Sequence, residues 1–310
     1  MKILITGIYG FIASHFARQF CHDFEIIGFG RDTNLKHRKR IEGLPIRVIH
    51  GDLNNPNDVS GILEDVDVVI HTAAKTFVDH SILDPLPFIQ SNIIGTYNLL
   101  EQARKYKPKL FINVSTDEVY GAILEGAYKE NSRLNPTNPY ASTKAAADML
   151  ALAYFNTYKL PVLITRTENN YGPYQHPQKA MPKFVYKALR GENLPVYGDG
   201  KHVRMWLHVQ DHCNALKFLV EKGVAGEIYH IAGEQELENI ELARLILKIL
   251  GKQENQIEFI DDYNIRPGHD RRYALDTSKL QALGWQPKVS LNEGLQKTVE
   301  WYRDNQWWFS

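Results

Sequence analysis

The chain has 310 residues, enough for about two domains' worth of core. Its 36 Lys and Arg residues balance 36 Asp and Glu residues, and 44% of its residues are hydrophobic. This composition excludes a disordered chain, and it lacks the basic excess with which proteins bind nucleic acid.

The two cysteines and the apolar segments bear on location. Cys21 and Cys213 lie far apart in the sequence, outside any metal-ligand spacing, so we expect reduced, inert thiols and no metal site. No stretch approaches the ~18 uninterrupted apolar residues that a membrane span needs, and residues 1–6 are too short for a secretory signal. We therefore expect a soluble, cytoplasmic protein with neither a membrane nor a nucleic acid as partner.

Strand-like apolar runs alternate with longer amphipathic segments through the first half of the chain. The expected strands are residues 2–6, 25–29, 46–50, 66–72, 109–115 and 161–165. Segments of helical length lie between them at 11–21, 87–106 and 140–158, long enough for right-handed crossovers. Because the runs are apolar on both faces, the pattern predicts an α/β fold with a doubly wound parallel sheet.

The regular alternation ends near residue 168, where turn-rich segments follow. A helix-like segment at 209–221 and a strand-like segment at 227–232 are expected to return to the sheet. We therefore predict a sheet domain of residues 1–168 plus about 204–232. A smaller mixed α/β lobe is predicted for about 169–203 plus 233–310.

The first expected strand runs into the segment GIYGFIA at residues 7–13. Glycine permits a tight turn and close approach of the backbone to a ligand, and the following helix offers free N–H groups to a pyrophosphate. Because the motif stands between a strand and a helix, it predicts a dinucleotide site. The candidate contacts are Gly7, Tyr9, Gly10, Phe11 and Ile12, with NAD or NADP as cofactor.

The residues after the second strand bear on whether the cofactor is NAD or NADP. An acid there would bond the ribose of NAD, whereas an Arg would accommodate the extra phosphate of NADP. Here Gly30 stands at the expected acid, Arg31 follows, and Asp32 comes one step later, so both cofactors stay open. Arg31 could equally be a solvated loop charge. Asp52, followed by Leu53, is a candidate contact for the adenine.

A second group of candidates carries acid–base chemistry. Tyr140 and Lys144 stand four residues apart at the start of an expected helix, so they share a face, and an ammonium beside a phenol favours the phenolate. Such a Tyr can take a hydroxyl proton while hydride leaves for a nicotinamide. Thr116, at the end of a strand, can reach the same oxygen. Asp117 and Glu118 follow, and adjacent acids can divide acid and base roles, although a solvated loop pair is the alternative.

Several motifs together resemble the extended short-chain dehydrogenases/reductases of the nucleotide-sugar epimerase/dehydratase type, over nearly the whole chain. They are Gly7-x-x-Gly10 with Phe11-Ile12, His71-Thr72-Ala73-Ala74, Tyr140-x-x-x-Lys144 and the segment NNYGP at 169–173. Within that group, STDEVYG at 115–121, NYGPYQ at 170–175 and RPGHDRRY at 266–273 resemble the dTDP-glucose 4,6-dehydratases.

The resemblance implies a Rossmann-type fold and a redox-neutral reaction on an NDP-hexose, most readily dTDP-glucose. Tyr140, aided by Thr116 and Lys144, would deprotonate the hydroxyl of the fourth carbon while hydride passes to the nicotinamide. Glu118 would remove the neighbouring proton, and Asp117 would protonate the hydroxyl that leaves the sixth carbon. Hydride then returns to that carbon, which yields an NDP-4-keto-6-deoxyglucose and makes the protein a hydro-lyase.

The resemblance also implies binding residues and a partner. The further cofactor contacts are Thr72, Ala73, Ala74 and Asn92, and the substrate contacts are Thr76, Asn169, Asn170, Lys179, Arg204, Arg266 and His269. A guanidinium suits a diphosphate because it can form bidentate hydrogen bonds. Helices at about 93–106 and 140–158 resemble the pair that forms a four-helix interface, so a homodimer is expected, although their apolar positions could equally be core.

Four positions depart from the pattern of the family. Lys75 stands in place of Glu, Glu168 in place of Ser, Met205 in place of Asp, and His230 in place of Asn. These departures leave UDP-glucose or another NDP-hexose open as substrate. A UDP-glucuronate decarboxylase or a 4-epimerase is the nearest alternative, but neither needs both acids. A non-catalytic dinucleotide-binding regulatory protein is the alternative from another class.

Overall fold

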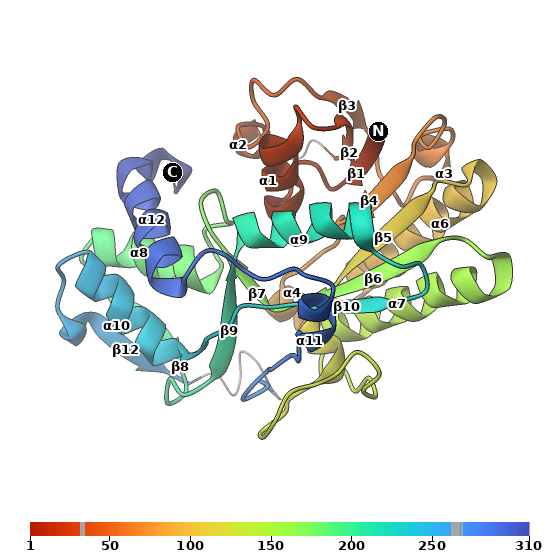
Figure 1. The fold of residues 1–310 in the computed structure, drawn as a ribbon. Helices are drawn as coiled ribbons and strands as arrows, with labels where there is room; N and C mark the ends of the chain where they lie inside the picture. The colour runs from red at the N-terminus through yellow and green to blue at the C-terminus, as the bar shows by residue number, and fades with distance from the viewer. Residues whose placement is uncertain (32–34, 262–266, 268, 310) are drawn as a thin grey trace.

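The computed structural model describes residues 1–31, 35–261, 267 and 269–309. Within them, seven strands form a sheet in the order β10-β6-β5-β4-β1-β2-β3, and every pair of neighbours is parallel (Figure 1). The strands are β1 (Lys2–Thr6), β2 (Glu25–Gly30), β3 (Arg47–His50), β4 (Val68–His71), β5 (Leu110–Thr116), β6 (Val162–Thr167) and β10 (Ile228–Ile231). The predicted doubly wound sheet is confirmed, and 227–232 joins it beside β6.

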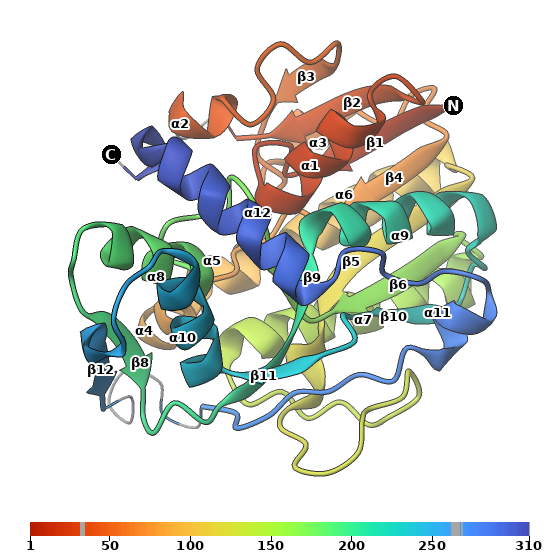
Figure 2. The same ribbon diagram turned by 60° about the vertical axis from the view of Figure 1, so that its left-hand side comes forward.

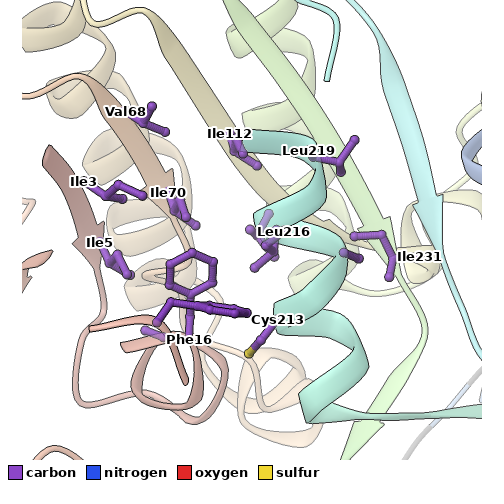
Figure 3. Close-up of a cluster of buried hydrophobic side chains, with 14 of the residues drawn as sticks. Ile3, Ile5, Phe16, Val68, Ile70, Ile112, Cys213, Leu216, Leu219 and Ile231 are labelled. Atoms are coloured by element: carbon purple, nitrogen blue, oxygen red, sulfur yellow. The ribbon is translucent and has the colours of Figure 1, made fainter. Parts of the chain in front are cut away.

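Helices cover both faces of this sheet because alternate residues of each strand point to opposite faces. Ile3 and Ile5 of β1 pack on one face with Phe16 of α1 (Phe11–Phe20) and Leu216 of α9 (Val209–Lys222) (Figure 3). Leu4, which lies between the two isoleucines, belongs to the cluster on the opposite face. That cluster also contains side chains of α6 (Gly95–Tyr106) and α7 (Pro139–Tyr158). The result is a three-layer arrangement in which the inner strands are buried on both sides.

The segment expected as one helix at 87–106 is divided. A short helix, α5 (Leu86–Phe88), leads into a π-helical stretch at Ile89–Ile94, and α6 follows. Asn92 in this stretch is buried, and its side chain holds the backbone of Lys75 through both its oxygen and its nitrogen (2.8 and 3.0 Å). The π-helical turn therefore places a polar side chain where it fixes the loop that follows β4.

The remaining short helices lie in the segments that connect the longer elements. They are α2 (Leu35–Arg38), α3 (Pro56–Val59), α4 (Val78–Leu83), α11 (Ser278–Ala282) and the 3-10 helices η2 (Asp117–Tyr120), η3 (Glu254–Gln256) and η4 (Gln306–Trp308). No helix among the described residues has the length and apolar character required to traverse a bilayer.

A second group of elements packs around its own core beside the large sheet (Figure 2). Three strands, β7 (Asn169–Tyr171), β9 (Val203–His208) and β11 (Glu236–Glu238), form one small sheet, and β8 (Leu194–Tyr197) pairs with β12 (Ile257–Ile260) in another. The helices are α8 (Ala180–Leu189), α10 (Asn239–Ile249) and α12 (Leu291–Asp304). β9 pairs with β7 and β11 and lies outside the large sheet. The division into residues 1–168 plus about 204–232 and about 169–203 plus 233–310 stays a prediction.

Candidate active site

A cavity of about 420 Å³ lies where the carboxyl ends of the central strands meet the second group of elements. Open parallel sheets bind their ligands at this edge. Many of the predicted site residues line it, namely Gly10, Phe11, Ile12, Thr72, Ala74, Thr76, Thr116, Asp117, Glu118, Tyr140, Lys144, Asn169, Asn170, Lys179 and Arg204. Residues from distant parts of the sequence are thus brought into one hollow.

The glycine-rich turn packs tightly against the loop that follows β4. Gly7 has φ +71°, and a Cβ there would lie 2.9 Å from the Cα of Ala73, so only glycine fits without strain. The N–H of Gly10 donates to the carbonyl of Gly7 (2.6 Å), and no side chain caps the first turn of α1. The N–H groups at the start of α1 are therefore available for an anionic ligand.

A threonine at the end of β1 ties this turn to the loop after β4. The Thr6 hydroxyl accepts a hydrogen bond from the N–H of Ala73 (3.2 Å), and the Thr72 hydroxyl donates to the Thr6 carbonyl (2.7 Å). Thr72, Ala73 and Ala74 are held beside Gly7 as a result. The two loops are packed directly against each other, and Gly10, Thr72 and Ala74 from them line the cavity.

The ends of β2 and β3 hold the candidates for the adenosine end. Arg31 donates to the carboxylate of Asp52 (3.3 Å), so its charge is paired across the two strand ends. Tyr9 stacks on His50, with ring centroids 6.0 Å apart. Leu53 is buried in the core, and Asp32 lies outside the described residues.

Tyr140 is placed by the first turn of α7. The side chain of Asn138 caps this helix by accepting from the N–H of Ala141 (2.9 Å), and Pro139 begins it. Tyr140 is buried beside Thr116 in the cavity, and burial raises the pKa of Tyr140 well above its ordinary value. The phenol therefore stays protonated unless positive charge is brought beside it.

Lys144 lies one turn further along α7 and is also buried. Its ammonium donates to the Val114 carbonyl (2.7 Å), and burial lowers its pKa, although the charge of Asp148 opposes this shift. Tyr140, Lys144 and Thr116 line the same cavity.

Asp117 and Glu118 meet different surroundings although they are neighbours. Asp117 is buried, and the Thr116 hydroxyl donates to its Oδ1 (2.9 Å). Burial, followed by the charge of Glu118, raises the pKa of Asp117 to about 7. Glu118 is half-buried and accepts a hydrogen bond from the side chain of Asn138 (3.2 Å). The pair thus provides one carboxyl that retains its proton near neutral pH beside one in a more open, hydrogen-bonded setting.

Lys179 and Asn170 approach the cavity from the opposite wall. The Lys179 ammonium donates to the Thr76 carbonyl (3.0 Å) and lies 4.6 Å from the ring centre of Phe77. The Asn170 side chain donates to the Glu168 carbonyl (2.9 Å) and lies 2.8 Å from Nδ1 of His212. Lys179 directly precedes α8, and its contacts with Thr76 and Phe77 therefore link the two groups of elements.

Arg204 is a buried guanidinium on β9. It donates to the backbone carbonyls of Val203 (2.7 Å) and Asp270 (2.8 Å), and it stacks over Tyr273 at 4.4 Å. His269 contacts the same guanidinium (3.1 Å) and does not line the cavity itself. Arg266 lies outside the described residues.

The cavity also contains residues that the motifs did not indicate as binding groups. They include Ser115, Glu168, Tyr273 and Arg40. Arg40 is buried and donates to the carbonyls of Tyr9 (2.6 Å) and Tyr174 (2.8 Å), which joins the glycine-rich turn to the opposite wall. No local spacing marks Arg40 or Glu168, because their partners lie far away in the sequence. Ser115 and Tyr273, in contrast, lie inside the motifs at 115–121 and 266–273. Glu168 could have been found from its departure from the family pattern.

Comparison with known proteins identifies the family. A family model described as GDP-mannose 4,6 dehydratase matches residues 4–298. The chain belongs to this family. A dTDP-glucose 4,6-dehydratase of Streptomyces niveus is 43% identical over 99% of this chain and 95% of the relative. The low-salt glycan biosynthesis protein Agl12 of Haloferax volcanii is also 43% identical, over 97% of this chain and 98% of the relative.

Solved structures agree with this assignment. The dTDP-glucose 4,6-dehydratase DesIV of Streptomyces venezuelae, crystallised with NAD, has a TM-score of 0.95 at 43% identity and covers 99% of this chain and 98% of its own. A UDP-glucose 4-epimerase of Thermus thermophilus with NAD has a TM-score of 0.91 at 28% identity, over 98% of this chain and 100% of its own. The predicted fold of the extended short-chain dehydrogenases/reductases is confirmed.

Proposed function

We propose that the protein is an NDP-hexose 4,6-dehydratase that acts on dTDP-glucose. The observation that carries this proposal is the acid pair Asp117 and Glu118, which lines the same cavity as Tyr140 and Lys144. A 4-epimerase or a decarboxylase needs the Tyr and Lys but not both acids. The full-length relatives at 43% identity that are named dTDP-glucose 4,6-dehydratases support the same assignment.

The cavity beside the glycine-rich turn fits a nicotinamide dinucleotide. A Cβ at Gly7 would meet the backbone of Ala73, so the packing of the turn against the loop after β4 needs glycine, and the uncapped first turn of α1 offers N–H groups to a pyrophosphate. Gly10, Phe11, Ile12, Thr72 and Ala74 would line the bound cofactor, with Asp52 toward the adenosine. Bound there, the cofactor accepts a hydride from the sugar and later returns it.

In the oxidation step, Tyr140 takes the proton of the hydroxyl on the fourth carbon, with Thr116 beside it in the cavity. Because burial favours the neutral phenol, a phenolate needs stabilisation by positive charge. Lys144, one turn away on α7, is the group that supplies it from the protein. The carbon loses a hydride and its oxygen loses a proton, so a ketone forms.

In the elimination step, the ketone acidifies the hydrogen on the fifth carbon, and Glu118 takes this proton. The bond between the sixth carbon and its oxygen breaks, and Asp117 gives a proton to that oxygen, which leaves as water. Hydride then returns to the sixth carbon and a proton returns to the fifth. The pKa of Asp117, raised to about 7, leaves a substantial share of the acid form near neutral pH.

The nucleotide and diphosphate fit the opposite wall. Arg204, Lys179 and Asn170 present cationic and amide groups to the cavity, and Thr76 and Asn169 lie beside them. Charge-assisted hydrogen bonds from such groups are the usual means of holding a diphosphate. His269 would act by orienting Arg204, which it contacts at 3.1 Å.

A homodimer is the assembly that the surface favours. Exposed apolar side chains lie on elements that contact one another, with Leu86 on α5, Ile89 and Ile94 on the π-helical stretch, Tyr97 on α6 and Met149 on α7. Apolar groups of this kind on adjacent helices are typical of an interface. A Met149→Lys variant should lower the mass measured by sedimentation equilibrium from that of a dimer to that of a monomer. An unchanged mass would place the interface elsewhere.

We also propose a cytoplasmic location, where Cys21 and Cys213, which form no disulfide, would stay reduced.

The proposed reaction can be tested by incubating the purified protein with dTDP-glucose and with UDP-glucose, without added cofactor. Mass spectrometry should detect the loss of one water from dTDP-glucose, with a ketone that borodeuteride traps. An Asp117→Asn, Glu118→Gln double variant should retain bound cofactor but lose no water. Unchanged dehydration by the double variant would falsify the roles given to the two acids, and dehydration of UDP-glucose alone would overturn the choice of nucleotide.

A further inference from the structure

A third carboxyl group stands in the cavity beside the acid pair. Glu168 follows β6 directly, and only 3% of its surface is exposed. Its Oε1 accepts a hydrogen bond from the N–H of Leu275 (2.8 Å). Its Oε2 is buried and has no hydrogen-bond partner among the described residues. A buried carboxylate oxygen in this condition is costly unless it carries or receives a proton.

Asp117 is arranged in the same way. Its side chain is 3% exposed, one oxygen accepts from the Thr116 hydroxyl, and the other, Oδ2, is buried without a hydrogen-bond partner in the described part of the chain. Both carboxyl groups line the same cavity, and the negative charge of Asp117 acts on Glu168. Each group therefore has one anchored oxygen and one free oxygen.

Two buried carboxylates that act on each other cannot both remain ionised cheaply, and such pairs retain one proton between them. We propose that Glu168 is a positioning residue that shares a proton with Asp117 and thereby keeps Asp117 supplied with the proton that the elimination consumes. This inference rests on the proposed function, because it concerns the acid of that reaction. Glu168 forms and breaks no bond to the sugar.

The charges around the pair favour a retained proton. Burial, and then the charge of Asp117, raises the pKa of Glu168 well above its ordinary value. The groups that face the pair from neighbouring elements are Arg204 of β9, Glu236 of β11, Arg272, Glu118 of η2 and Tyr140 of α7. Arg204 is the cation that acts on both carboxyl groups, and it donates to backbone carbonyls and contacts His269. Arg272 acts on Glu168 as well, but it is paired with Glu236. These two engaged cations therefore leave burial as the largest influence on both carboxyl groups.

The pair starts with a proton on Asp117 or on Glu168. When the bond from the sixth carbon to oxygen breaks, that oxygen keeps the bonding electrons, takes the proton from Asp117 and leaves as water. Asp117 is then ionised, and a proton held by Glu168 or regained from solvent restores the acid form for the next turnover.

Infrared titration of the unliganded protein tests the coupling. Ordinary Asp and Glu side chains are ionised above about pH 6, so protonated-carboxyl absorption that remains above pH 7 belongs to perturbed groups. In the wild type, this absorption should disappear at a pH about one unit or more higher than in the Asp117→Asn variant or the Glu168→Gln variant, because each variant retains only one of the two coupled carboxyl groups. The Gln side chain retains an acceptor for the N–H of Leu275.

Glu236→Gln is the matched control, because Glu236 also acts on Glu168 but is exposed. It should leave the last titration step nearly unchanged. If Glu168 loses its proton at the same pH in the Asp117→Asn variant as in the wild type, the two carboxyl groups titrate independently and the proposal is wrong.

A second measurement follows the reaction itself. The alkaline limb of kcat for dehydration should move to lower pH in Glu168→Gln and stay in place in Glu236→Gln. A uniform loss of kcat at all pH values, with the limb unmoved, would assign Glu168 a merely structural role and overturn the proposal. Failure of this proposal can be told apart from failure of the proposed function. If the protein dehydrates no sugar but the infrared titration still shows that Asp117 and Glu168 titrate together, the proposed function is wrong and the shared proton stands.

Discussion

The edge of the large sheet and the wall that faces it build the site in different ways. On the sheet edge, Gly7 directly follows β1 and Thr116 ends β5, and α7 brings Tyr140 and Lys144 to the same cavity. On the facing wall, Arg204 of β9 meets His269 and Tyr273, which are more than sixty residues away in the sequence. The groups for hydride and proton transfer therefore lie on strand ends and on the first turns of one helix, where short spacings relate them in part, whereas the groups for substrate binding depend on contacts between segments far apart in the sequence.

This difference predicts that changes on the sheet edge abolish chemistry and that changes on the facing wall weaken binding. The largest effect should come from Tyr140→Phe, which removes the base of the oxidation. We expect a loss in kcat of at least about 10²- to 10⁴-fold. Stopped-flow absorbance should detect no transient reduced nicotinamide after dTDP-glucose is added, while bound cofactor remains. Normal formation of reduced cofactor would assign the base elsewhere.

Gly7→Ala should remove most of the bound cofactor. The new Cβ would lie 2.9 Å from the Cα of Ala73, and the backbone would keep φ +71°. Gly43→Ala is the control, because Gly43 has φ +75° but nothing within 4 Å of a Cβ. Both variants carry the strain of about 1–2 kcal/mol of the left-handed conformation. The cofactor content of the purified proteins should fall only in Gly7→Ala, and an equal fall in both would attribute the loss to backbone strain.

Arg204→Met should raise KM by roughly 10- to 100-fold, since a hydrogen bond to a charged group contributes about 1.5–3 kcal/mol. The effect on kcat should be smaller. Arg271→Met serves as the control, because Arg271 is exposed and pairs with Asp199 (2.6 Å). Steady-state kinetics with dTDP-glucose separate the two parameters. A fall in kcat with an unchanged KM would move Arg204 into the chemical step.

The smallest effect should appear in stability. The pKa of Glu168 is raised by folding, so the folded state binds more protons than the unfolded state above about pH 4, and stability falls as pH rises. The Glu168→Gln variant should not lose stability in this way. The free energy of unfolding that it regains at high pH is about 1.4 kcal/mol for each unit by which the pKa of Glu168 differs between the folded and unfolded states. Tm of the variant should therefore exceed that of the wild type at pH 8 and match it more closely at pH 5. A lower Tm at both values would contradict the sign.

The same difference explains how much the sequence could reveal. Apolar runs such as those of β1 and β5 predict buried parallel strands, and fixed spacings predict that Tyr140 and Lys144 share a face. The π-helical stretch at Ile89–Ile94 has no such signal, since it interrupts an otherwise helical pattern. Arg40 was not predicted because its acceptors, Tyr9 and Tyr174, are set by the tertiary fold. The hydrogen bond of Glu168 could not be predicted for the same reason, because its donor, the N–H of Leu275, is brought to it by the tertiary fold.

The most direct test of the account follows one hydrogen atom. dTDP-glucose that carries deuterium on the fourth carbon should give a product with deuterium on the sixth carbon, because the protein oxidises the sugar and returns the same hydride after water leaves. Nuclear magnetic resonance of the product locates the label. Deuterium that is found again on the fourth carbon, or that is lost to solvent, would contradict a 4,6-dehydratase.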